Sequence, residues 1–296
     1  MSVPVPFVVG VAVAGVGLYA MYNRKGPGGK AADGTYTGKP IFSSFGFHSL
    51  TVQSTEMVTH NTKRVRFELP DSSQPCGLTV SSAVLTFAFP GGGWIPCVRP
   101  YTPVNDLDEP GVLDLLVKQY PNGRQSTHIH ALLPGDTLTM APLKVVTYKP
   151  NQHERVALVA GGAGITPMYQ LARGILANPA DRTVVTLVWG VNGDRDIFLA
   201  DELAALERAH PGRFTAHYVV SEPEAGSPHR KGRVTAQLLD KLGLDARRHE
   251  NRDIKVFVSG PPAMEKAIVG SRGWLRGGDK GVLAELGYEP GQVYKF

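Results

Sequence analysis

The sequence predicts two folded domains behind an N-terminal transmembrane helix: a small antiparallel β-barrel, then an α/β domain built on a doubly wound parallel sheet. Three observations predict this order. An uncharged apolar segment opens the chain, residues 41–142 contain short alternating segments separated by turn residues, and from Arg155 onward apolar strand segments alternate with helical ones. A chain of 296 residues is long enough for both domains and a sizeable core.

The N-terminal segment differs from the rest of the chain. Residues 3–22 carry no charge and are almost wholly apolar, and this length is enough to cross a bilayer as one helix. Arg24 and Lys25 follow at once, and basic residues favour the cytosolic side of a membrane. We therefore predict a membrane anchor over residues 1–24 and a flexible, glycine- and lysine-rich tether over residues 25–40. The alternative, a cleaved secretory signal, would need a positive leading region and a small-x-small cleavage site, which the sequence lacks.

Residues 41–150 are expected to form the barrel domain. Apolar and polar residues alternate with the period of half-buried strands, and Pro-Gly turns separate the segments. One short helix is expected among the strands, with Ser126 as its N-cap. Many short strands with frequent turns are typical of a small barrel. The expected strands cover residues 50–54, 63–69, 80–89, 113–120 and 137–140, and the helix covers 126–133.

Residues 151–296 are expected to form the α/β domain. Alternating strands and helices imply a parallel sheet with right-handed crossovers. Ligands of such sheets bind at the carboxyl ends of the strands, where the topology switches. The expected strands cover residues 155–160, 183–189, 214–221 and 255–258, and the helices cover 167–177, 198–210 and 234–242.

The composition excludes some classes of function. A chain that is 42% hydrophobic and 19% charged is ordinary for a globular protein. The net charge of +5 suits a membrane surface or an acidic partner, but no basic run interleaved with aromatics favours nucleic acid. Cys76 and Cys97 make neither a disulfide framework nor a metal set, although a bridge between them stays open, and the nine histidines lack metal-ligand spacing.

The string Arg99-Pro100-Tyr101-Thr102 combines a cation, an aromatic ring and a hydroxyl. An arginine fork can bind phosphates, a tyrosine can lie against a flat ring, and a threonine can hydrogen-bond a ring nitrogen, so these groups suit a flavin dinucleotide. On these residues alone, an edge strand with a proline bend explains the string equally well. Residues 123–126 follow soon after, at the start of the expected helix, where backbone amides can bind phosphate. The pair of features favours the flavin interpretation over a simple hairpin loop.

Two glycine turns follow strands of the α/β domain. Gly161-Gly162-Ala163-Gly164-Ile165-Thr166-Pro167 opens onto a helix, and Ser259-Gly260-Pro261-Pro262-Ala263-Met264 follows the strand at 255–258. Glycines let a diphosphate or a flat ring approach the backbone, and proline suits the first helical positions. Neither string is the Gly-x-Gly-x-x-Gly fingerprint, and each alone also fits a rigid turn. Together they predict two cofactor-facing loops on one edge of the sheet.

Three acidic residues follow the second strand of this domain: Asp194, Asp196 and Glu202. An acid at this place can bond both ribose hydroxyls of NADH and repel the extra phosphate of NADPH, although most such acids only cap helices. We favour Asp196 for the ribose.

These strings, in this order, resemble the ferredoxin–NADP reductase superfamily and, within it, the NADH-cytochrome b5 reductase family, whose fungal mitochondrial form is nearest. The likeness covers essentially the whole chain, including the apolar N-terminus, residues 59–62, 99–103, 123–126, 161–170 and 260–264, and Phe296. The resemblance implies a six-stranded flavin barrel and an NADH-binding α/β domain. It also implies hydride transfer from NADH to FAD, followed by single-electron transfer to the haem of cytochrome b5.

The resemblance further implies which residues hold the cofactors, with no metal among them. FAD would be held by Arg99, Pro100, Tyr101, Thr102, Val117, Lys118, Tyr120, Gly123, Arg124, Gln125, Ser126 and Thr166. The NADH groove would be lined by Gly161, Gly162, Thr166, Pro167, Asp196, Gly260, Pro261, Pro262 and Met264, with Phe296 near the domain interface. Thr102, Thr166 and Ser259 would be the catalytic positions, next to the reacting rings.

One residue and one three-residue segment depart from the family pattern. Ser259 stands where the family usually has a cysteine, so the polarisable sulfur near the nicotinamide is lost, which affects the expected hydride rate rather than the class of chemistry. Ser81-Ser82-Ala83 stands where many animal relatives have Gly-Gln-His, so a proton relay of the animal type is not expected.

The resemblance also implies a partner and a location. It implies a single-pass monomer in the mitochondrial outer membrane with its catalytic body on the cytosolic side; the endoplasmic reticulum and a soluble intermembrane-space form stay open. Lys63, Arg64, Arg124 and Lys144 are candidates to steer an acidic haem protein, and an ordinary basic surface is an equal alternative.

Three other functions stay open: a non-catalytic binding protein, a nicotinamide dehydrogenase without flavin, and the same flavin chemistry with a small radical or quinone acceptor.

Overall fold

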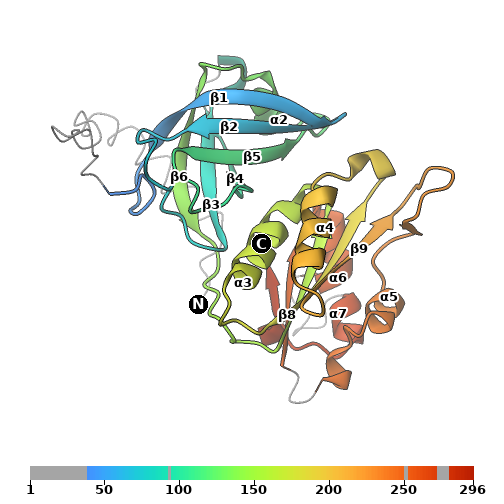
Figure 1. Ribbon diagram of the computed structural model, residues 1–296. Coiled ribbons are helices and arrows are strands. Elements are labelled where there is room, and N and C mark those ends of the chain that lie inside the picture. Colours follow the sequence, from blue (N-terminus) through green and yellow to red (C-terminus); the bar gives the residue numbers. More distant parts are fainter. Residues whose placement is uncertain (1–38, 93–94, 250–252, 272–279) are drawn as a thin grey trace.

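The computed structural model describes residues 39–92, 95–249, 253–271 and 280–296. The predicted anchor and all but the last two residues of the predicted tether lie outside these residues. Among the residues described, no helix is both long and apolar enough to cross a membrane. Figure 1 shows two bodies, with the strands β1 to β6 in one and β7 to β12 in the other.

The first body is a six-stranded antiparallel sheet that curls into a barrel, as predicted. Its strands run in the order β4-β3-β6-β1-β2-β5. The barrel closes between its two edge strands, because Pro103, just after β4, forms a bridge to Leu115, and the Val104 amide donates to the Asp114 carbonyl at 3.0 Å. The strands are β1 (His48–Thr59), β2 (Thr62–Glu68), β3 (Ser82–Ala88), β4 (Cys97–Tyr101), β5 (Val112–Lys118) and β6 (Thr137–Lys144).

The barrel core follows from the period-two pattern of these strands. Val65 and Phe67 of β2 and Leu113 and Leu115 of β5 all point inward and are fully buried. The short helix α2 (Arg124–Ala131) packs on this core through Ile129. The prediction that Ser126 caps this helix was wrong, because the helix begins two residues earlier and Gly123 occupies the N-cap. A further short helix, η1 (Pro90–Gly92), lies in the β3–β4 connection.

The second body is a six-stranded parallel sheet, also as predicted. Its order is β10-β9-β8-β7-β11-β12, so the topology switches direction between β7 and β11. The two shortest strands, β10 and β12, were not predicted, because segments of two and three residues show no periodicity. The strands are β7 (Arg155–Gly161), β8 (Val184–Val191), β9 (Phe214–Val220), β10 (Arg230–Lys231), β11 (Ile254–Ser259) and β12 (Val293–Lys295).

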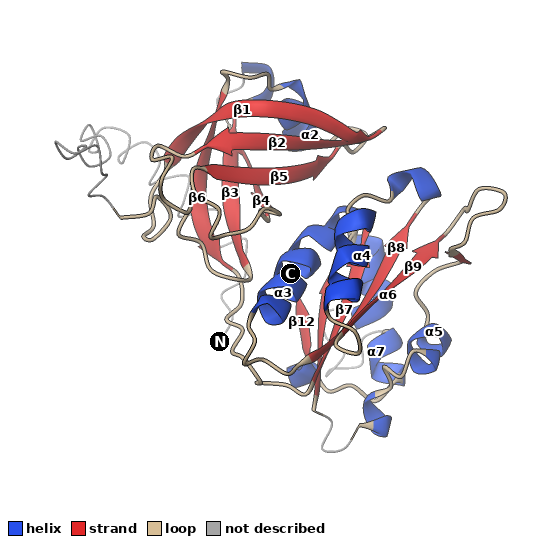
Figure 2. Ribbon diagram, in the orientation of Figure 1, coloured by secondary structure: helices blue, strands red, loops and turns tan. Residues whose placement is uncertain are grey.

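Helices cover both faces of this sheet (Figure 2). The helices α3 (Ile165–Ala177) and α4 (Ala200–Ala209) bury one face in the cluster that contains Met168 and Leu203. The helices α5 (Ala236–Lys241), α6 (Pro262–Val269) and α7 (Val282–Glu285) bury the other, in the cluster that contains Leu238 and Ile268. Four short 3-10 helices complete the set of helices in the described parts: η2 (Gly162–Gly164), η3 (Asp194–Asp196), η4 (Ala246–Arg248) and η7 (Pro290–Gln292).

The two bodies are packed against each other through α3. Val104 and Leu116 of the barrel domain belong to the same buried cluster as the apolar face of α3. Gln170 on α3 donates to the Pro103 carbonyl at 3.2 Å, and Arg173 donates to the Val104 carbonyl at 3.1 Å. The predicted domain boundary at residue 150 lies in the connection between β6 and β7. Cys76 and Cys97 are both free and buried, so they form no disulfide.

Candidate functional site

The glycine turn after β7 faces the barrel domain and lies next to the Tyr120 side chain. A Cβ added to Gly162 would lie 3.8 Å from the Tyr120 phenol oxygen. Burial raises the pKa of Tyr120, and a hydrogen bond from the Ala163 backbone opposes that rise. Tyr120 is still 42% exposed, so its ring borders solvent beside the turn. The contact places the end of β5 and the start of α3 on opposite walls of one site.

The Arg-Pro-Tyr-Thr string lies on β4, an edge strand of the barrel. Pro100 is tolerated there because an edge strand has one side without a ladder partner. The Arg99 side chain is exposed and bonds only locally, to the Val98 carbonyl at 2.8 Å. Burial raises the pKa of the Tyr101 phenol, and the neighbouring Cys97 and Tyr120 add to the rise. Tyr101 is half-buried and packs partly against the barrel core. Thr102 is half-buried directly after the strand.

A polar connection joins β3, β4 and α2 behind this string. The Thr86 hydroxyl donates to the Arg99 carbonyl at 3.1 Å and accepts from the Gln125 amide at 2.8 Å. The Gln125 carbonyl oxygen is buried and has no partner among the described residues. Sequence reasoning assigned no role to Thr86. The available signal was a polar residue flanked by Leu85 and Phe87 in an apolar strand.

The start of α2 presents a second set of donors. The Ser126 hydroxyl donates to the Gly123 carbonyl at 3.0 Å and accepts from the Tyr120 amide at 3.4 Å. A Cβ at Gly123 would meet the same hydroxyl, so glycine is required by packing. The first-turn amides of a helix have no intrahelical acceptor, and Arg124 is exposed beside them. An open cavity of about 510 Å³ adjoins this turn, lined by Pro90, Gly91, Asn122, Arg124, Thr127, His128 and Ala131.

These donors fit a flavin dinucleotide. Arg99, Arg124 and the α2 amides can bind a diphosphate, Tyr101 and Tyr120 can lie against flat rings, and the buried Gln125 oxygen can accept a hydrogen bond. Val117 is fully buried in the barrel core, so its side chain supports the site from behind.

The two glycine strings of the α/β domain lie at the same edge of the sheet, as predicted, and they also lie against each other. A Cβ on Gly161 would collide with the Met264 sulfur, and one on Gly164 would collide with the Ser259 carbonyl. The contact at Gly260 is tight but less severe, since its Cβ would lie 3.1 Å from the Gly161 Cα. These glycines are therefore required by the contact between the loops. Gly162, with φ +50°, leaves the surface toward Tyr120 bare.

The residues around these loops are held rigidly. The Thr166 hydroxyl donates to the Ala163 carbonyl at 3.2 Å, and Pro167 is buried in the first turn of α3. The Trp189 indole donates to the Gly162 carbonyl at 3.0 Å. Across the sheet, Pro261 is the N-cap of α6 and Pro262 its first residue, so the loop after Ser259 leads directly into a helix.

Phe296 lies beside the interface, as expected. Its amide donates to the Val258 carbonyl at 3.0 Å, and its ring centroid is 5.3 Å from that of Tyr294. The Tyr294 hydroxyl in turn donates to the Val145 carbonyl at 2.7 Å, which ties the last strand to the connection between the domains.

Asp196 has partners other than those expected. Its carboxylate accepts from Lys118 at 2.7 Å and Asn61 at 2.9 Å, both in the barrel domain. Lys118 is 9% exposed and Asp196 6%. Sequence reasoning gave Asn61 no role, although it noted the residue. The assignment of Asp196 to a ribose stays a prediction, with its carboxylate already engaged in this structure.

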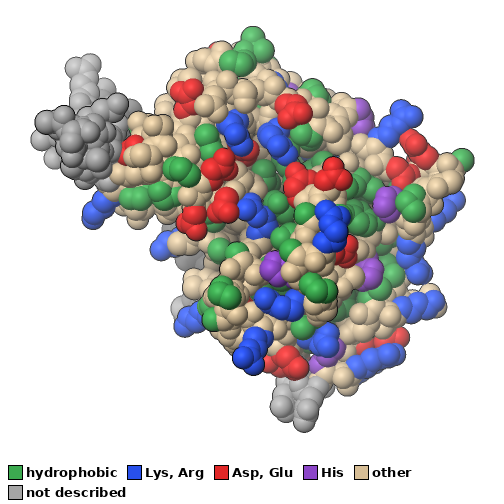
Figure 3. Space-filling model, in the orientation of Figure 1, with side chains coloured by type: hydrophobic (Ala, Val, Ile, Leu, Met, Phe, Trp, Pro, Cys, Tyr) green, Lys and Arg blue, Asp and Glu red, His purple; other side chains and the backbone are tan. Residues whose placement is uncertain are grey.

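The steering hypothesis loses one of its four cations. Lys63 is buried, and its ammonium donates to the carbonyls of His130 at 2.9 Å and Leu132 at 2.7 Å. Arg64 lies 3.4 Å from Glu202, so part of its charge is compensated. Arg124 and Lys144 are exposed. Basic and acidic side chains are interspersed on the face shown in Figure 3.

Comparisons with known proteins agree with this geometry. Residues 49–148 match the family described as "Oxidoreductase FAD-binding domain", and residues 158–270 match "Oxidoreductase NAD-binding domain". NADH-cytochrome b5 reductase 2 of Pyricularia oryzae is 46% identical over 291 residues, covering 97% of this chain and 87% of the relative. The protein of the same name from Chaetomium globosum is 50% identical over 254 residues, covering 85% of this chain and 72% of the relative.

A solved structure also matches. The cytochrome b5 reductase domain of Ulva prolifera nitrate reductase superposes with a TM-score of 0.73 at 26% identity, covering 87% of this chain and all of that domain. The barrel and the parallel sheet are therefore the two halves of a known arrangement, the first for FAD and the second for NADH. The chain belongs to the NADH-cytochrome b5 reductase family of FAD- and NADH-dependent oxidoreductases.

Proposed function

We propose that the protein takes electrons from NADH and delivers them singly, by way of FAD, to cytochrome b5 at a membrane surface. The single observation that carries the proposal is the meeting of Tyr120 with the bare glycine turn at Gly162 and Ala163. It sets the flavin side and the nicotinamide side of the site against each other. The names of the fungal relatives support cytochrome b5 as the acceptor.

The residues contribute positioning rather than acid–base chemistry. The chemistry supplied by bound FAD is hydride acceptance followed by single-electron release. Arg99 and the start of α2 would hold its phosphates, and Tyr101 and Tyr120 would orient its ring system. The paired glycine loops would admit the nicotinamide, with Thr166 fixed at the turn and Ser259 at the end of β11.

The location belongs to the same proposal. A single N-terminal anchor in the mitochondrial outer membrane would hold a monomeric catalytic body on the cytosolic side. The support is the uncharged segment at residues 3–22, followed at once by Arg24 and Lys25. Fractionation of cells expressing the full chain, with protease treatment of intact mitochondria, tests this. Digestion of the catalytic body in intact mitochondria is expected, and its protection would refute this orientation.

Stopped-flow spectroscopy of the full chain in detergent tests the electron path. The purified protein should be yellow, NADH should bleach the flavin band, and added cytochrome b5 should restore it. A quinone or a small radical that reoxidises the flavin much faster than cytochrome b5 would overturn the acceptor. A colourless protein that no added FAD turns yellow would overturn the whole assignment.

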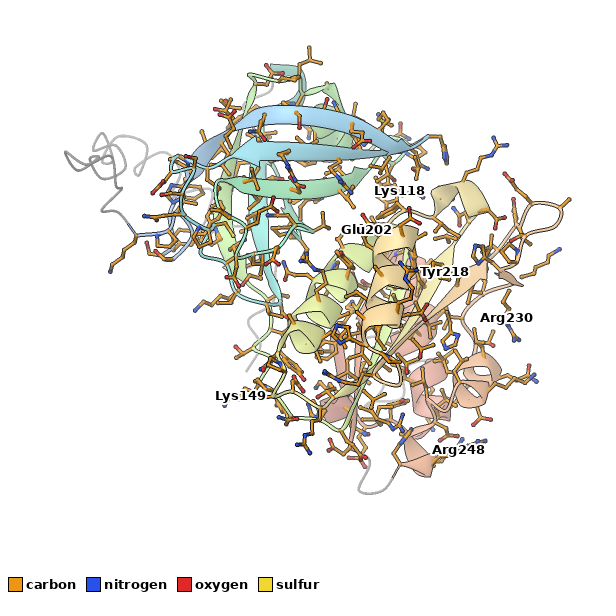
Figure 4. All side chains as sticks on the ribbon, in the orientation of Figure 1. Lys118, Lys149, Glu202, Tyr218, Arg230 and Arg248 are labelled. Atoms are coloured by element: carbon orange, nitrogen blue, oxygen red, sulfur yellow. The ribbon has the colours of Figure 1, made fainter. Side chains whose placement is uncertain are left out.

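Arg99→Ala tests the flavin site directly. The guanidinium is exposed and makes only a local bond, so the variant should fold while losing most of its FAD. Arg230→Ala is the matched control, because Arg230 is also exposed but lies on the short edge strand β10 of the other domain (Figure 4). Equal FAD content in the two variants would contradict the role of Arg99.

A further inference from the structure

The Asp196 carboxylate lies at the contact between the two domains, and both of its oxygens accept hydrogen bonds. One oxygen accepts from the Lys118 ammonium at 2.7 Å and the Asn61 amide at 2.9 Å. The other accepts from the Gly193 backbone amide at 3.2 Å. A carboxylate engaged on both oxygens in this way has little capacity left for two ribose hydroxyls.

The donors come from two neighbouring strands of the barrel. Asn61 lies in the turn between β1 and β2, and Lys118 is the last residue of β5. The Gln119 amide donates to the Asn61 carbonyl at 2.7 Å, so the two donors are fixed relative to each other. Asp196 ends η3, directly after β8. One side chain therefore joins two barrel strands to the parallel sheet.

The charge state supports a tight pair. Burial alone would raise the pKa of Asp196, but hydrogen bonds from Lys118 and Asn61 and the Lys118 charge outweigh it, so the pKa lies below its usual value. The carboxylate is therefore ionised at neutral pH. A buried, hydrogen-bonded ion pair can select one arrangement of the elements it joins, because separating its charges leaves them unpaired.

The position of the pair matters for the site. Tyr120, which meets the glycine turn, is two residues beyond Lys118. The domains are already joined by the bond from Tyr294 to Val145 and by the contacts of α3 with residues 103 and 104, and the Asp196 pair adds an attachment beside Tyr120. Because this attachment lies two residues from Tyr120, its loss should loosen the contact between Tyr120 and the glycine turn, while the α3 contacts keep the domains together.

We propose that Asp196 and Lys118 form an interdomain tie, and that Asp196 acts as a positioning residue that aligns the nicotinamide loops with the flavin side. A neighbouring ion pair offers a contrast. Arg64 and Glu202 also join the domains, at 3.4 Å, but their side chains are 34% and 39% exposed. Figure 4 labels Lys118 at the end of β5 and Glu202 on α4. An exposed pair of that kind contributes little.

A double-mutant cycle with Asp196→Asn and Lys118→Met tests the tie, with flavin reduction followed at saturating NADH and without cytochrome. Displacements near 1 Å slow an aligned reaction about 100-fold, so each variant should lower the limiting rate about 10- to 100-fold. The double variant should be no slower than the slower single one. Arg64→Met is the matched control and should change the rate less than about twofold.

The ribose role makes the opposite prediction. If Asp196 binds NADH, then Asp196→Asn raises the KM for NADH, improves the use of NADPH, and leaves the limiting rate unchanged. That result, or additive effects of the two variants, would overturn the tie. Because no acceptor is present, this outcome is independent of whether cytochrome b5 is the partner.

Hydrogen exchange of the oxidised protein provides a readout that does not depend on turnover. Loss of the tie should speed exchange at the Gly193 amide and over residues 162–164, while the barrel strands β3 and β6 stay protected. Unchanged exchange at these sites in a folded Asp196→Asn variant would also refute the proposal. If that variant does not accumulate, Lys118→Gln keeps a donor at the same place and allows the same comparison.

Discussion

A methyl group placed at Gly164 should force apart the two loops that form the nicotinamide side of the site. The added Cβ of Gly164→Ala would collide with the Ser259 carbonyl and lie 2.9 Å from the Gly260 nitrogen. These are backbone atoms, so no flexible side chain can yield. Gly164 itself has φ −61°, which alanine adopts freely, so the collision is the only new cost.

The magnitude follows from the collision. Overpacking of a tight contact costs about 1–3 kcal/mol, and we expect the upper half of that range because both partners are backbone. For a domain of this size, about 2 kcal/mol corresponds to about 4–8 °C in the melting temperature. The displaced loop should also slow flavin reduction by NADH, because it carries the turn that meets Tyr120. Differential scanning calorimetry and stopped-flow absorbance measure the two effects.

Gly190→Ala is the matched control. A Cβ at Gly190, near the end of β8, would lie 3.7 Å from its nearest neighbours, which is ordinary contact. This variant should change the melting temperature by less than about 2 °C, the equivalent of about 0.5 kcal/mol. Equal melting temperatures for the two variants would refute the claim that loop contact, rather than backbone freedom, requires glycine at Gly164.

Three further changes test other parts of the structure. Ser81→Gly should raise the unfolding free energy by about 1 kcal/mol in urea titration, because Ser81 has φ +66° and its buried hydroxyl has no partner among the described residues. Asp245→Asn should lower the melting temperature at pH 7. The difference should shrink as pH falls from about 4 toward 2, since Arg247 lowers the pKa of Asp245 from 3.8 to about 2 and protonation removes the contribution of the carboxylate. Lys63→Met should cost about 1–3 kcal/mol, because two carbonyls at the end of α2, one in a buried and one in a part-buried hydrogen bond, lose their donor. The variant should leave the salt dependence of cytochrome b5 reduction unchanged.

Each of these changes has its own contrary outcome. Ser82→Gly, next to Ser81 but inside β3 and hydrogen-bonded to Thr79, should destabilise, and a gain there would contradict the φ argument. A constant difference between Asp245→Asn and the unmodified protein from pH 7 to pH 2 would contradict the linkage. If Lys63→Met weakened the salt dependence of cytochrome b5 reduction as much as the exposed Lys144→Gln does, Lys63 would have to be counted among the cations that steer the partner.

Much of the fold could be predicted because its signals are local. Alternation marked β1 and β2, and apolar segments followed by glycine turns marked β7 and β11, which the structure confirms. The predicted start of α2 was wrong by two residues. Ser126 is a residue type that often caps helices, but its hydroxyl bonds to the Gly123 carbonyl and the Tyr120 amide instead.

The candidate site was predicted in its outline rather than in its contacts. The apposition of Gly161 with the loop after β11 follows from both strings lying at the carboxyl ends of neighbouring strands. The partners of Asp196 could not be inferred, because Asn61 and Lys118 reach it only once the two domains are packed. Lys63 was predicted to be a surface cation for a similar reason. The sequence around it does not show that the end of α2 packs over its side chain.

The proline in β4 disfavours self-association of the protein through this strand edge. Strand edges recruit other strands through their unpaired amides, and Pro100 supplies none. The edge that carries Arg99 and Tyr101 is thus a poor template for self-association, and it stays accessible to a small molecule at protein concentrations where an unprotected edge would aggregate. Replacing Pro100 with another residue would add an unpaired amide and make this ligand-accessible edge more prone to self-association.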